Sequence, residues 1–212
     1  EPEVIAISPE MRHLMGLLDR VAHTDANLLI CGESGTGKDL LAEVLHYRSS
    51  RRSGQIVKID CATLPDELLE SELFGYERGA FTGAVTFKPG RLETAAGGTL
   101  VLDEILHLGL QNQAKLLRVI EERSFMRLGG TRQIRVDARL VVLSRVELSE
   151  AVEKGLLRAD LFHRFNVVSI YIPPLRERAE DLSALLQVYL RRTSARHNKQ
   201  VSRISREAMR LL

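Results

Sequence analysis

The stretch LLICGESGTGKDLLAEVLH, Leu28 to His46, decides the fold of this chain. The apolar run Leu28 to Cys31 predicts a short buried strand. A glycine-rich turn, residues 32–37, leads into Lys38 and a segment in which apolar residues recur every three to four positions, as in a helix. A strand, a glycine loop and a helix with a lysine at its start form the arrangement of a phosphate-binding loop.

The glycines of this turn suit a backbone that wraps around an anion, because a residue without a Cβ turns tightly and brings N–H groups close to a phosphate. The helix N-terminus adds partial positive charge, and Lys38 is expected to reach the β- and γ-phosphates of a nucleotide. The alternative is an ordinary glycine-rich turn before a surface helix. The residues expected to contact the nucleotide in this stretch are Gly32, Glu33, Ser34, Gly35, Thr36, Gly37, Lys38, Asp39 and Leu40.

Acidic residues are the candidate metal ligands. Asp39 stands where the general motif has Ser or Thr for Mg²⁺, and a carboxylate can hold that ion directly or through water. The apolar segment 97–105 predicts a strand that ends at Asp103 and Glu104. If this strand lies beside residues 28–31, Asp103 is expected to bind Mg²⁺, and Glu104 to orient or deprotonate an attacking water. The alternative is a pair of acids that begins the next helix, where the helix dipole favours them.

Composition indicates a globular protein with an ordinary charge balance. The chain has 212 residues, enough for one domain or one domain with a small appendage. Thirty basic and 28 acidic residues give a net charge of +2, which is no electrostatic footprint for nucleic acid or membrane. The two cysteines, Cys31 and Cys61, lie in or beside predicted buried strands, which favours a reducing compartment. No apolar run approaches the roughly 20 residues of a membrane span. We therefore expect a cytoplasmic protein.

Strand-like and helix-like segments alternate along the chain. The predicted strands are residues 28–31, 56–60, 97–105, 138–144 and 166–174. The predicted helices are residues 9–23, 38–46, 64–75, 111–123 and 148–154, a second one after Gly155, a helical region that begins with residues 176–198, and a further helix that includes Leu211 and Leu212. A hairpin is predicted around Gly129 and Gly130. This order predicts an α/β fold: a five-stranded, mostly parallel sheet with helices on both faces. We expect an α/β core at 1–173 and the start of a separate small helical piece at 174–212.

The segment ERGAFTGAVTFKPG, residues 77–90, has neither a helical nor a strand period. A loop of this length in a compact domain is usually functional or disordered. Phe81 and Thr82 lie between two Gly-Ala pairs, and exposing an aromatic side chain on such a tip is costly unless it contacts a partner. The sequence therefore predicts a partner-binding loop; a plain surface loop is the alternative.

Several stretches together resemble one family. GESGTGKD, ELFGYERGAFTGA, GGTLVLDEI, LLRVIEERSFMRLGG, LLRADLFHRFNVV and PPLRERAEDL are similar to the central ATPase domain of bacterial sigma-54-dependent transcriptional activators, the AAA+ enhancer-binding proteins. The resemblance covers nearly the whole chain. The hexapeptide GAFTGA is specific to that family, whereas the phosphate-binding loop alone is not.

The resemblance implies an AAA+ P-loop ATPase that binds ATP and Mg²⁺ between the subunits of a homo-oligomeric ring, a hexamer or heptamer. It implies that hydrolysis moves the GAFTGA loop against the sigma-54 subunit of RNA polymerase. The expected partner-binding residues are Gly79, Ala80, Phe81, Thr82, Gly83 and Ala84. DNA contact is implied only through a helix-turn-helix domain that this sequence does not contain, and no membrane contact is implied.

The resemblance also assigns roles to single residues. Asp39 matches the family's acidic residue after the lysine, and Asp103 and Glu104 match its Walker B pair. Arg158 and Arg164 match the arginines that reach into the neighbouring subunit's site, where a guanidinium stabilises charge on the transferred phosphoryl group. A surface salt bridge is the alternative for each arginine.

Three departures from the family pattern stand out. Arg145 holds the position of the sensor asparagine after the fourth strand, where the family feels the γ-phosphate. Asp60 holds the position of the switch asparagine that binds the Walker B glutamate; an ionised Asp60 beside Glu104 would repel it or one acid would take up a proton. The sequence also ends before the family's lid motif with its second sensor arginine, so we expect 174–212 to be an incomplete lid.

The main hypothesis is an ATP-hydrolysing ring that remodels sigma-54 polymerase. A nucleotide-binding regulatory scaffold with weak or no hydrolysis is the second, motivated by Arg145 and Asp60. A small-molecule kinase with the same phosphate-binding loop is the third. The features specific to rings, Arg158, Arg164 and residues 79–84, argue against the kinase.

Overall fold

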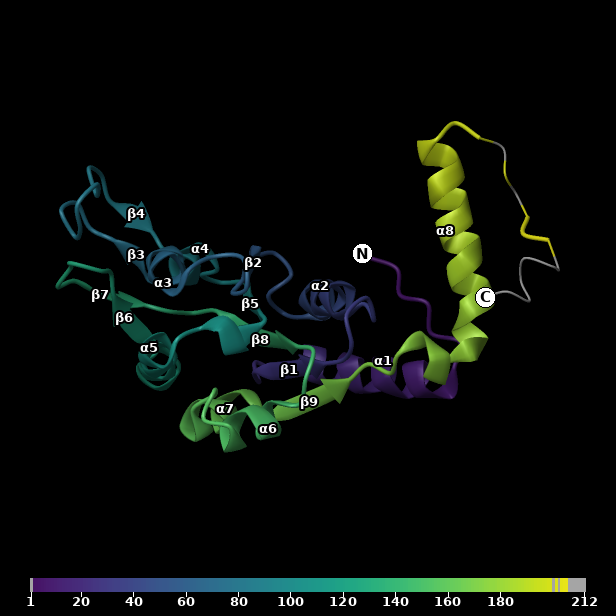
Figure 1. Cartoon of the computed structure of the whole chain (residues 1–212), viewed down its shortest axis with the longest axis horizontal. Coiled ribbons are helices and arrows are strands. Elements are labelled where there is room, and N and C mark those ends of the chain that lie inside the picture. Colours follow the sequence, from purple (N-terminus) through teal and green to yellow (C-terminus); the bar gives the residue numbers. More distant parts are fainter. Residues whose placement is uncertain (1, 200, 202, 206–212) are drawn as a thin grey trace.

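The computed structural model describes residues 2–199, 201 and 203–205. Its centre is a five-stranded parallel sheet with the strand order β2-β5-β8-β1-β9 (Figure 1). The strands are β1 (Leu28–Cys31), β2 (Ile56–Asp60), β5 (Thr99–Asp103), β8 (Arg139–Ser144) and β9 (Val168–Tyr171). All five strands lie in segments that the sequence predicted, so the predicted sheet is confirmed.

Helices cover both faces of the sheet, as the sequence predicted. They are α1 (Pro9–Ala22), α2 (Lys38–Arg48), α3 (Asp66–Phe74), α4 (Arg91–Thr94), α5 (Leu110–Glu122), α6 (Leu148–Glu153), α7 (Ala159–Phe165) and α8 (Leu182–Arg196), with 3-10 turns η1 (Ile105–His107), η2 (Leu175–Glu177) and η3 (Ala179–Asp181). Side chains alternate along β8: Val141 packs with α1 and α2, whereas Val142 packs with α3, α5 and α7.

The order of the strands corrects one expectation. The acidic strand was expected beside the strand of the phosphate-binding loop, but β8 lies between β5 and β1. All six residues of β8 are buried, so this strand needs a neighbour on each edge and a helix layer on each face. Asp103 and Cys31 are consequently two strand spacings apart, about 10 Å in the sheet.

Two short strand pairs extend one end of the molecule (Figure 1). The predicted hairpin is confirmed as β6 (Ser124–Met126) against β7 (Gln133–Arg135). The sequence did not predict the second pair, β3 (Gly75–Tyr76) against β4 (Lys88–Pro89), which closes the base of the GAFTGA loop. A pair of two-residue strands leaves no hydrophobic period, so pattern analysis cannot find it.

Helix α8 stands apart from the sheet (Figure 1). None of its residues is fully buried, whereas every other helix of eight residues or more buries part of one face. The division into a core and a lid from residue 174 stays a prediction. The further helix expected around Leu211 and Leu212 lies outside the described residues. Within the described residues, no helix combines the length and apolar character needed to cross a membrane.

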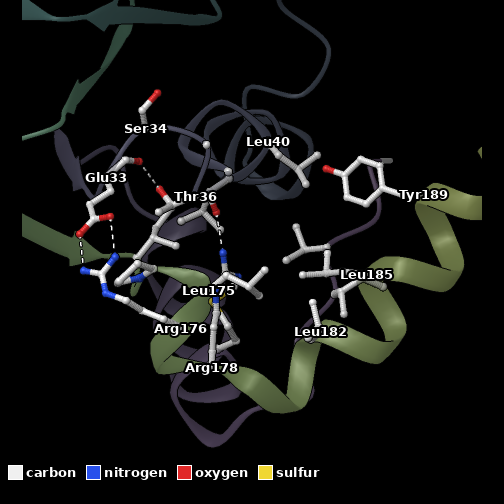
Figure 2. A pocket seen from close by; sticks show the side chains of 18 of the residues that line it. Glu33, Ser34, Thr36, Leu40, Leu175, Arg176, Arg178, Leu182, Leu185 and Tyr189 are labelled. Carbon is white, nitrogen blue, oxygen red and sulfur yellow. Dashed lines mark hydrogen bonds and ion pairs between the residues drawn. The ribbon is translucent and has the colours of Figure 1, made fainter. Parts of the chain in front are cut away.

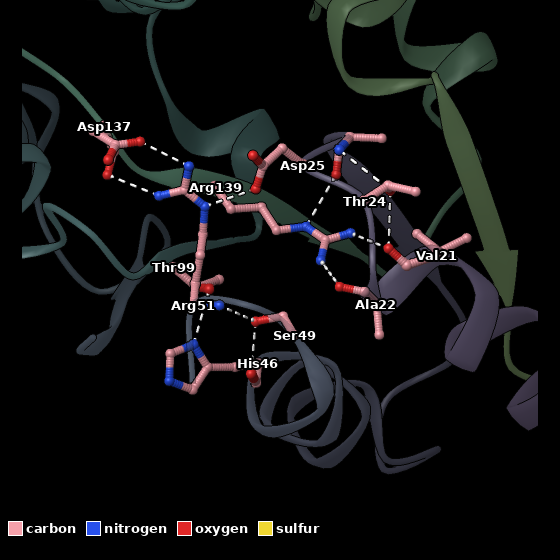
Figure 3. A network of polar contacts seen from close by, with 11 residues as sticks. Val21, Ala22, Thr24, Asp25, His46, Ser49, Arg51, Thr99, Asp137 and Arg139 are labelled. Atoms are coloured by element: carbon pink, nitrogen blue, oxygen red, sulfur yellow. Dashed lines mark hydrogen bonds and ion pairs between the residues drawn. The ribbon is translucent and has the colours of Figure 1, made fainter. Parts of the chain in front are cut away.

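A buried arginine joins the sheet to the first helix (Figure 3). The guanidinium of Arg139, at the start of β8, donates to the carbonyls of Ala26 at 3.0 Å, Ala22 at 3.2 Å and Val21 at 2.9 Å. Two of these carbonyls belong to the last turn of α1, where no further helical turn follows to supply donors. Burial lowers the pKa of Arg139, and the carboxylate of Asp25 opposes that shift.

A first prediction follows from this contact. Arg139→Met keeps the length of the buried side chain but removes all three donors, so the free energy of unfolding should fall by about 3 kcal/mol. Urea unfolding measures the change, and Arg135→Met, at an exposed arginine on β7, is the control. A loss no larger than that of the control would mean that these three hydrogen bonds contribute nothing net.

Candidate nucleotide site

The glycine loop joins β1 to α2 and takes a conformation that needs glycine. Gly35 has φ 79° and Gly37 has φ 103°, in the left-handed region that L side chains rarely adopt. Gly37 is the residue before the first turn of α2 and offers no side chain to cap it. The N–H groups of that turn are therefore open to an anion from outside the helix.

Lys38 lies inside the loop rather than in solvent. It is 8% exposed, and its ammonium donates to the carbonyl of Gly32 at 2.7 Å and to that of Glu33 at 2.9 Å. The loop carbonyls thus hold the cation within the ring of backbone groups that the sequence pattern assigns to phosphates. A bound phosphate would replace these two carbonyls as the hydrogen-bond acceptor of Lys38, because an anion is a stronger acceptor than a neutral oxygen.

The candidate metal ligands meet despite the strand between them. Asp103 ends β5, Asp39 lies in the first turn of α2, and the ammonium of Lys58 contacts both carboxylates. The distance from Lys58 Nζ to Asp103 Oδ2 is 2.8 Å. The predicted ligands thus converge on one cationic group, although no cluster of three or more metal-ligating side chains occurs among the described residues.

Two carboxylates fit the need of Mg²⁺ in a nucleotide site. This ion is commonly held by one or two protein carboxylates, with phosphate oxygens and waters completing its shell. Lys58 was not predicted at this place, because a lysine in the strand pattern IVKID looks like an ordinary solvent-facing residue.

Glu104 is engaged by Arg145. The Nε of Arg145 donates to Oε1 of Glu104 at 2.5 Å, and this hydrogen bond raises the pKa of the guanidinium. Glu104 itself has φ 53°, a left-handed conformation uncommon for a residue with a side chain. This turn places Glu104 at the carboxyl ends of the strands. Arg145, the residue that follows β8, contacts it there.

Asp60 lies at the same edge but has a different partner. It is in register with Asp103 at the ends of β2 and β5, and its carboxylate accepts a hydrogen bond from the N–H of Ala62 at 2.9 Å. Asp60 and Glu104 thus have separate partners, the N–H of Ala62 and the guanidinium of Arg145.

A cavity of about 420 Å³ opens next to the glycine loop (Figure 2). One wall is polar and consists of residues 33–37; the opposite wall is apolar and includes Ile5 together with Leu182, Leu185 and Tyr189. A polar wall at the phosphate-binding loop and an apolar wall beside it suit a ligand with phosphates at one end and a flat, weakly polar ring at the other.

Two arginines after β9 bind the glycine loop (Figure 2). Arg176 contacts Glu33 with two parallel hydrogen bonds, at 2.8 and 2.5 Å, and Arg178 donates to the carbonyl of Thr36 at 2.9 Å. Arg178 is 6% exposed, and its Nε has no partner among the described residues. Neither arginine was predicted from the sequence; the dense charge of LRERAED was the available signal.

The GAFTGA loop is remote from this site, at the end of the molecule formed by β3, β4, β6 and β7 (Figure 1). It closes on itself, because the N–H of Gly79 donates to the carbonyl of Ala84 at 2.8 Å. Phe81 is 47% exposed and packs edge-on against Tyr76, with 4.9 Å between the ring centroids. Gly79, Phe81, Thr82 and Gly83 are thus exposed on one turn, whereas Ala84, also predicted to bind a partner, is buried at 5% exposure.

Arg158 and Arg164 also lie outside the cavity. Arg158 precedes α7 and pairs with Asp160 at 2.7 Å, while Arg164, within α7, pairs with Glu121 at 2.7 Å. Both side chains are on the surface of their own chain, 40% and 54% exposed. Surface ion pairs of this kind contribute little to stability, so a different partner can replace them.

Comparison with known proteins places these features in context. The family described as the Sigma-54 interaction domain matches residues 4–171. A Nif-specific regulatory protein of Herbaspirillum seropedicae is 48% identical over 99% of this chain and 39% of its own length. Regulatory protein AtoC of Escherichia coli is 46% identical over 99% of this chain and 45% of its own length. The chain therefore spans less than half of these curated relatives.

Solved structures show the same fold. NtrX of Brucella abortus superposes with a TM-score of 0.90 at 35% identity, over 97% of this chain and 46% of that one. A structure of NtrX in complex with ATP superposes with a TM-score of 0.84 at 37% identity, over 91% of this chain and 41% of that one. A P-loop NTPase domain from E. coli, at 22% identity and a TM-score of 0.55 over 78% of this chain and 95% of that one, supports the fold alone.

Proposed function

The chain belongs to the sigma-54 interaction domain family, and from this premise we propose that it hydrolyses ATP and couples hydrolysis to remodelling of sigma-54 RNA polymerase through its GAFTGA loop. The observation that carries the proposal is the convergence of Asp39 and Asp103 on one cation beside a phosphate-binding loop. That pairing brings a metal-binding edge and an anion-binding helix terminus together, which phosphoryl transfer requires.

Each residue has a distinct task in the proposed reaction. The backbone of residues 32–37 and Lys38 hold the β- and γ-phosphates, with Lys38 leaving the carbonyls that it contacts in the free chain. Asp39 and Asp103 would hold Mg²⁺, which would supply charge neutralisation when bound. Glu104 orients the attacking water and takes its proton as the oxygen bonds to the γ-phosphorus and ADP leaves.

Arg158 and Arg164 complete the site from a second copy of the chain. Both are exposed on their own subunit and outside its cavity, and each makes a surface ion pair that a contact with a neighbouring subunit would replace. We propose a homo-oligomeric ring, a hexamer or heptamer, in which a guanidinium of one subunit stabilises the phosphoryl group bound to the next. We also propose that the described residues after 174 act as a lid over the nucleotide, since Leu182, Leu185 and Tyr189 line the cavity.

The proposed partner surface is the loop tip and its apolar neighbours. Phe81, Val85 and Phe87 are 47%, 74% and 58% exposed, a concentration of apolar surface on one short loop. Exposed apolar clusters of this kind mark protein contacts. The proposed partner is the sigma-54 subunit.

One observation favours the second hypothesis, a nucleotide-binding scaffold. The pair between Arg145 and Glu104 occupies the carboxylate that hydrolysis needs. If the pair persists with nucleotide bound, binding continues and turnover stops. Point variants at this site distinguish ATP hydrolysis from nucleotide binding without turnover.

Lys38→Ala and Glu104→Gln should separate binding from turnover. Lys38→Ala removes a charged donor to the phosphates and should weaken ATP binding about a hundredfold. Glu104→Gln keeps the shape of the side chain but removes the base, so it should bind ATP normally and release no phosphate. Fluorescent-nucleotide titration and a phosphate-release assay measure the two quantities, with Lys115→Ala at an exposed lysine as the control. Unchanged affinity in Lys38→Ala, or a normal rate in Glu104→Gln, would remove that residue from its proposed role.

Arg145→Asn should raise ATP turnover, because it frees Glu104 from its ion pair. Exposed ion pairs are weak, so the expected gain is about threefold. Arg145→Lys, which retains the charge, should stay near the wild-type rate. A lower rate in Arg145→Asn would instead mean that the guanidinium itself acts on the nucleotide.

Thr82→Ala should leave ATP turnover unchanged and abolish binding to sigma-54 in a pull-down with the purified subunit. The residue lies on the remote loop and touches nothing in the nucleotide site. Thr86→Ala, an exposed threonine of the same loop outside the hexapeptide, is the matched control. Equal loss of turnover and binding in Thr82→Ala would show that the loop serves the fold rather than the partner.

A further inference from the structure

Lys58 is the residue that the proposed reaction leaves without a task. It lies in the middle of β2, the edge strand of the sheet, and is in register with Val101 of β5. Side chains alternate along a strand, so Lys58 shares a face with Ile56 and Asp60. Ile56 packs with the core cluster that contains α2, and Lys58 therefore extends along the α2 side of the sheet toward the glycine loop.

The ammonium of Lys58 ends between two carboxylates that come from different elements. It contacts Asp39 in the first turn of α2 and lies 2.8 Å from Oδ2 of Asp103 at the end of β5. The side chain of Asp103 is 14% exposed and that of Lys58 is 40% exposed. One positive charge thus neutralises half of the negative charge that these two acids bring together.

The electrostatics keep this group charged. Partial burial disfavours the ammonium, but hydrogen bonds to Asp103 and Asp39 outweigh that effect and raise the pKa of Lys58 above its usual value. The position of the ammonium between the two carboxylates, rather than its pKa, is what places a positive charge at this site. The ammonium of Lys58 thus occupies the position between Asp39 and Asp103 that Mg²⁺ would take.

We propose that Lys58 is an internal counter-ion that occupies the divalent-cation position between Asp39 and Asp103 when nucleotide is absent, and that the metal arriving with nucleotide displaces it. The inference rests on the proposed function and adds a regulatory property to the same site. Lys58 keeps the two acids close together without metal, and it makes free divalent cations compete with an ammonium that is already in position.

The proposal has two consequences for binding. Without nucleotide, the site should bind divalent cations poorly. A metal ion must first displace the ammonium of Lys58 from the two carboxylates, and the displaced ammonium then repels the metal. With metal-free ATP, Lys58 should remain in position and reduce repulsion between the phosphates and the two acids. The dependence of ATP affinity on Mg²⁺ is thus moderated by a charge that the protein itself supplies.

Lys58→Met tests both consequences, because it keeps an unbranched side chain and removes the charge. Nucleotide-free protein is titrated with Mn²⁺ by electron paramagnetic resonance, and ATP affinity is measured with and without Mg²⁺. In Lys58→Met, Mn²⁺ should bind about tenfold more tightly, and the ratio of metal-free to Mg²⁺-bound dissociation constants of ATP should rise about tenfold. Lys58→Arg should resemble the wild type. Lys115→Met, at another exposed lysine that pairs with a glutamate, is the control and should change neither quantity.

Unchanged Mn²⁺ affinity and an unchanged Mg²⁺ ratio in a folded Lys58→Met would overturn the proposal and leave Lys58 as a surface ion pair. Lys58→Gln serves as the second neutral variant, and the same changes in both quantities are expected of it. In the wild type, the resonance of the Lys58 ammonium should shift when Mg²⁺ and ATP are added together; a resonance that does not move would contradict displacement. If the wild type binds no ATP at all, the proposed function fails, whereas the Mn²⁺ titration still decides the role of Lys58.

Discussion

The acidic carboxyl edge of the sheet is the constraint on which the site depends. Asp60 and Asp103 end neighbouring strands in register, Glu104 follows directly, and Asp39 approaches from α2. Carboxylates gathered at one place repel one another unless cations stand between them. The chain supplies those cations from its own residues: Lys58 lies between Asp39 and Asp103, and Arg145 contacts Glu104. A metal ion that arrives with nucleotide would then replace a positive charge that the chain already supplies at the site.

The contacts around α3 connect this edge to the remote loop. The short η1 turn follows Glu104, and the N–H of Gly109 just beyond it donates to the carboxylate of Asp66 at 2.8 Å. Asp66 begins α3, and α3 ends where β3 starts the GAFTGA loop. Helix α3 thus has one end bound to Gly109, beyond the acidic strand and η1, and the other end at the base of the loop. Helix α3 therefore offers a physical route for the proposed coupling between the nucleotide site and the GAFTGA loop.

Local sequence predicted the strands and helices well, but it predicted less well which of them lie side by side. The strand, loop and helix around Lys38 could be predicted because apolar period, glycine and lysine all occur within one short stretch. The place of β8 between β5 and β1 could not, since strand order depends on long-range packing that no local pattern records. The partners of the acids were missed for the same reason: Lys58 and Arg145 are distant in sequence from Asp39 and Glu104. The arginine fingers and the GAFTGA contact remain predictions from family resemblance, because their partners lie outside the chain.

The most direct test of the central claim is the rate of phosphate release per chain as a function of protein concentration, with Glu104→Gln as the inactive reference. A shared site predicts a specific rate that rises with concentration as Arg158 and Arg164 reach neighbouring chains, and that vanishes in the reference at every concentration. A flat rate near zero over the same range, with ATP bound at every concentration, would contradict the account and identify a nucleotide-binding scaffold instead.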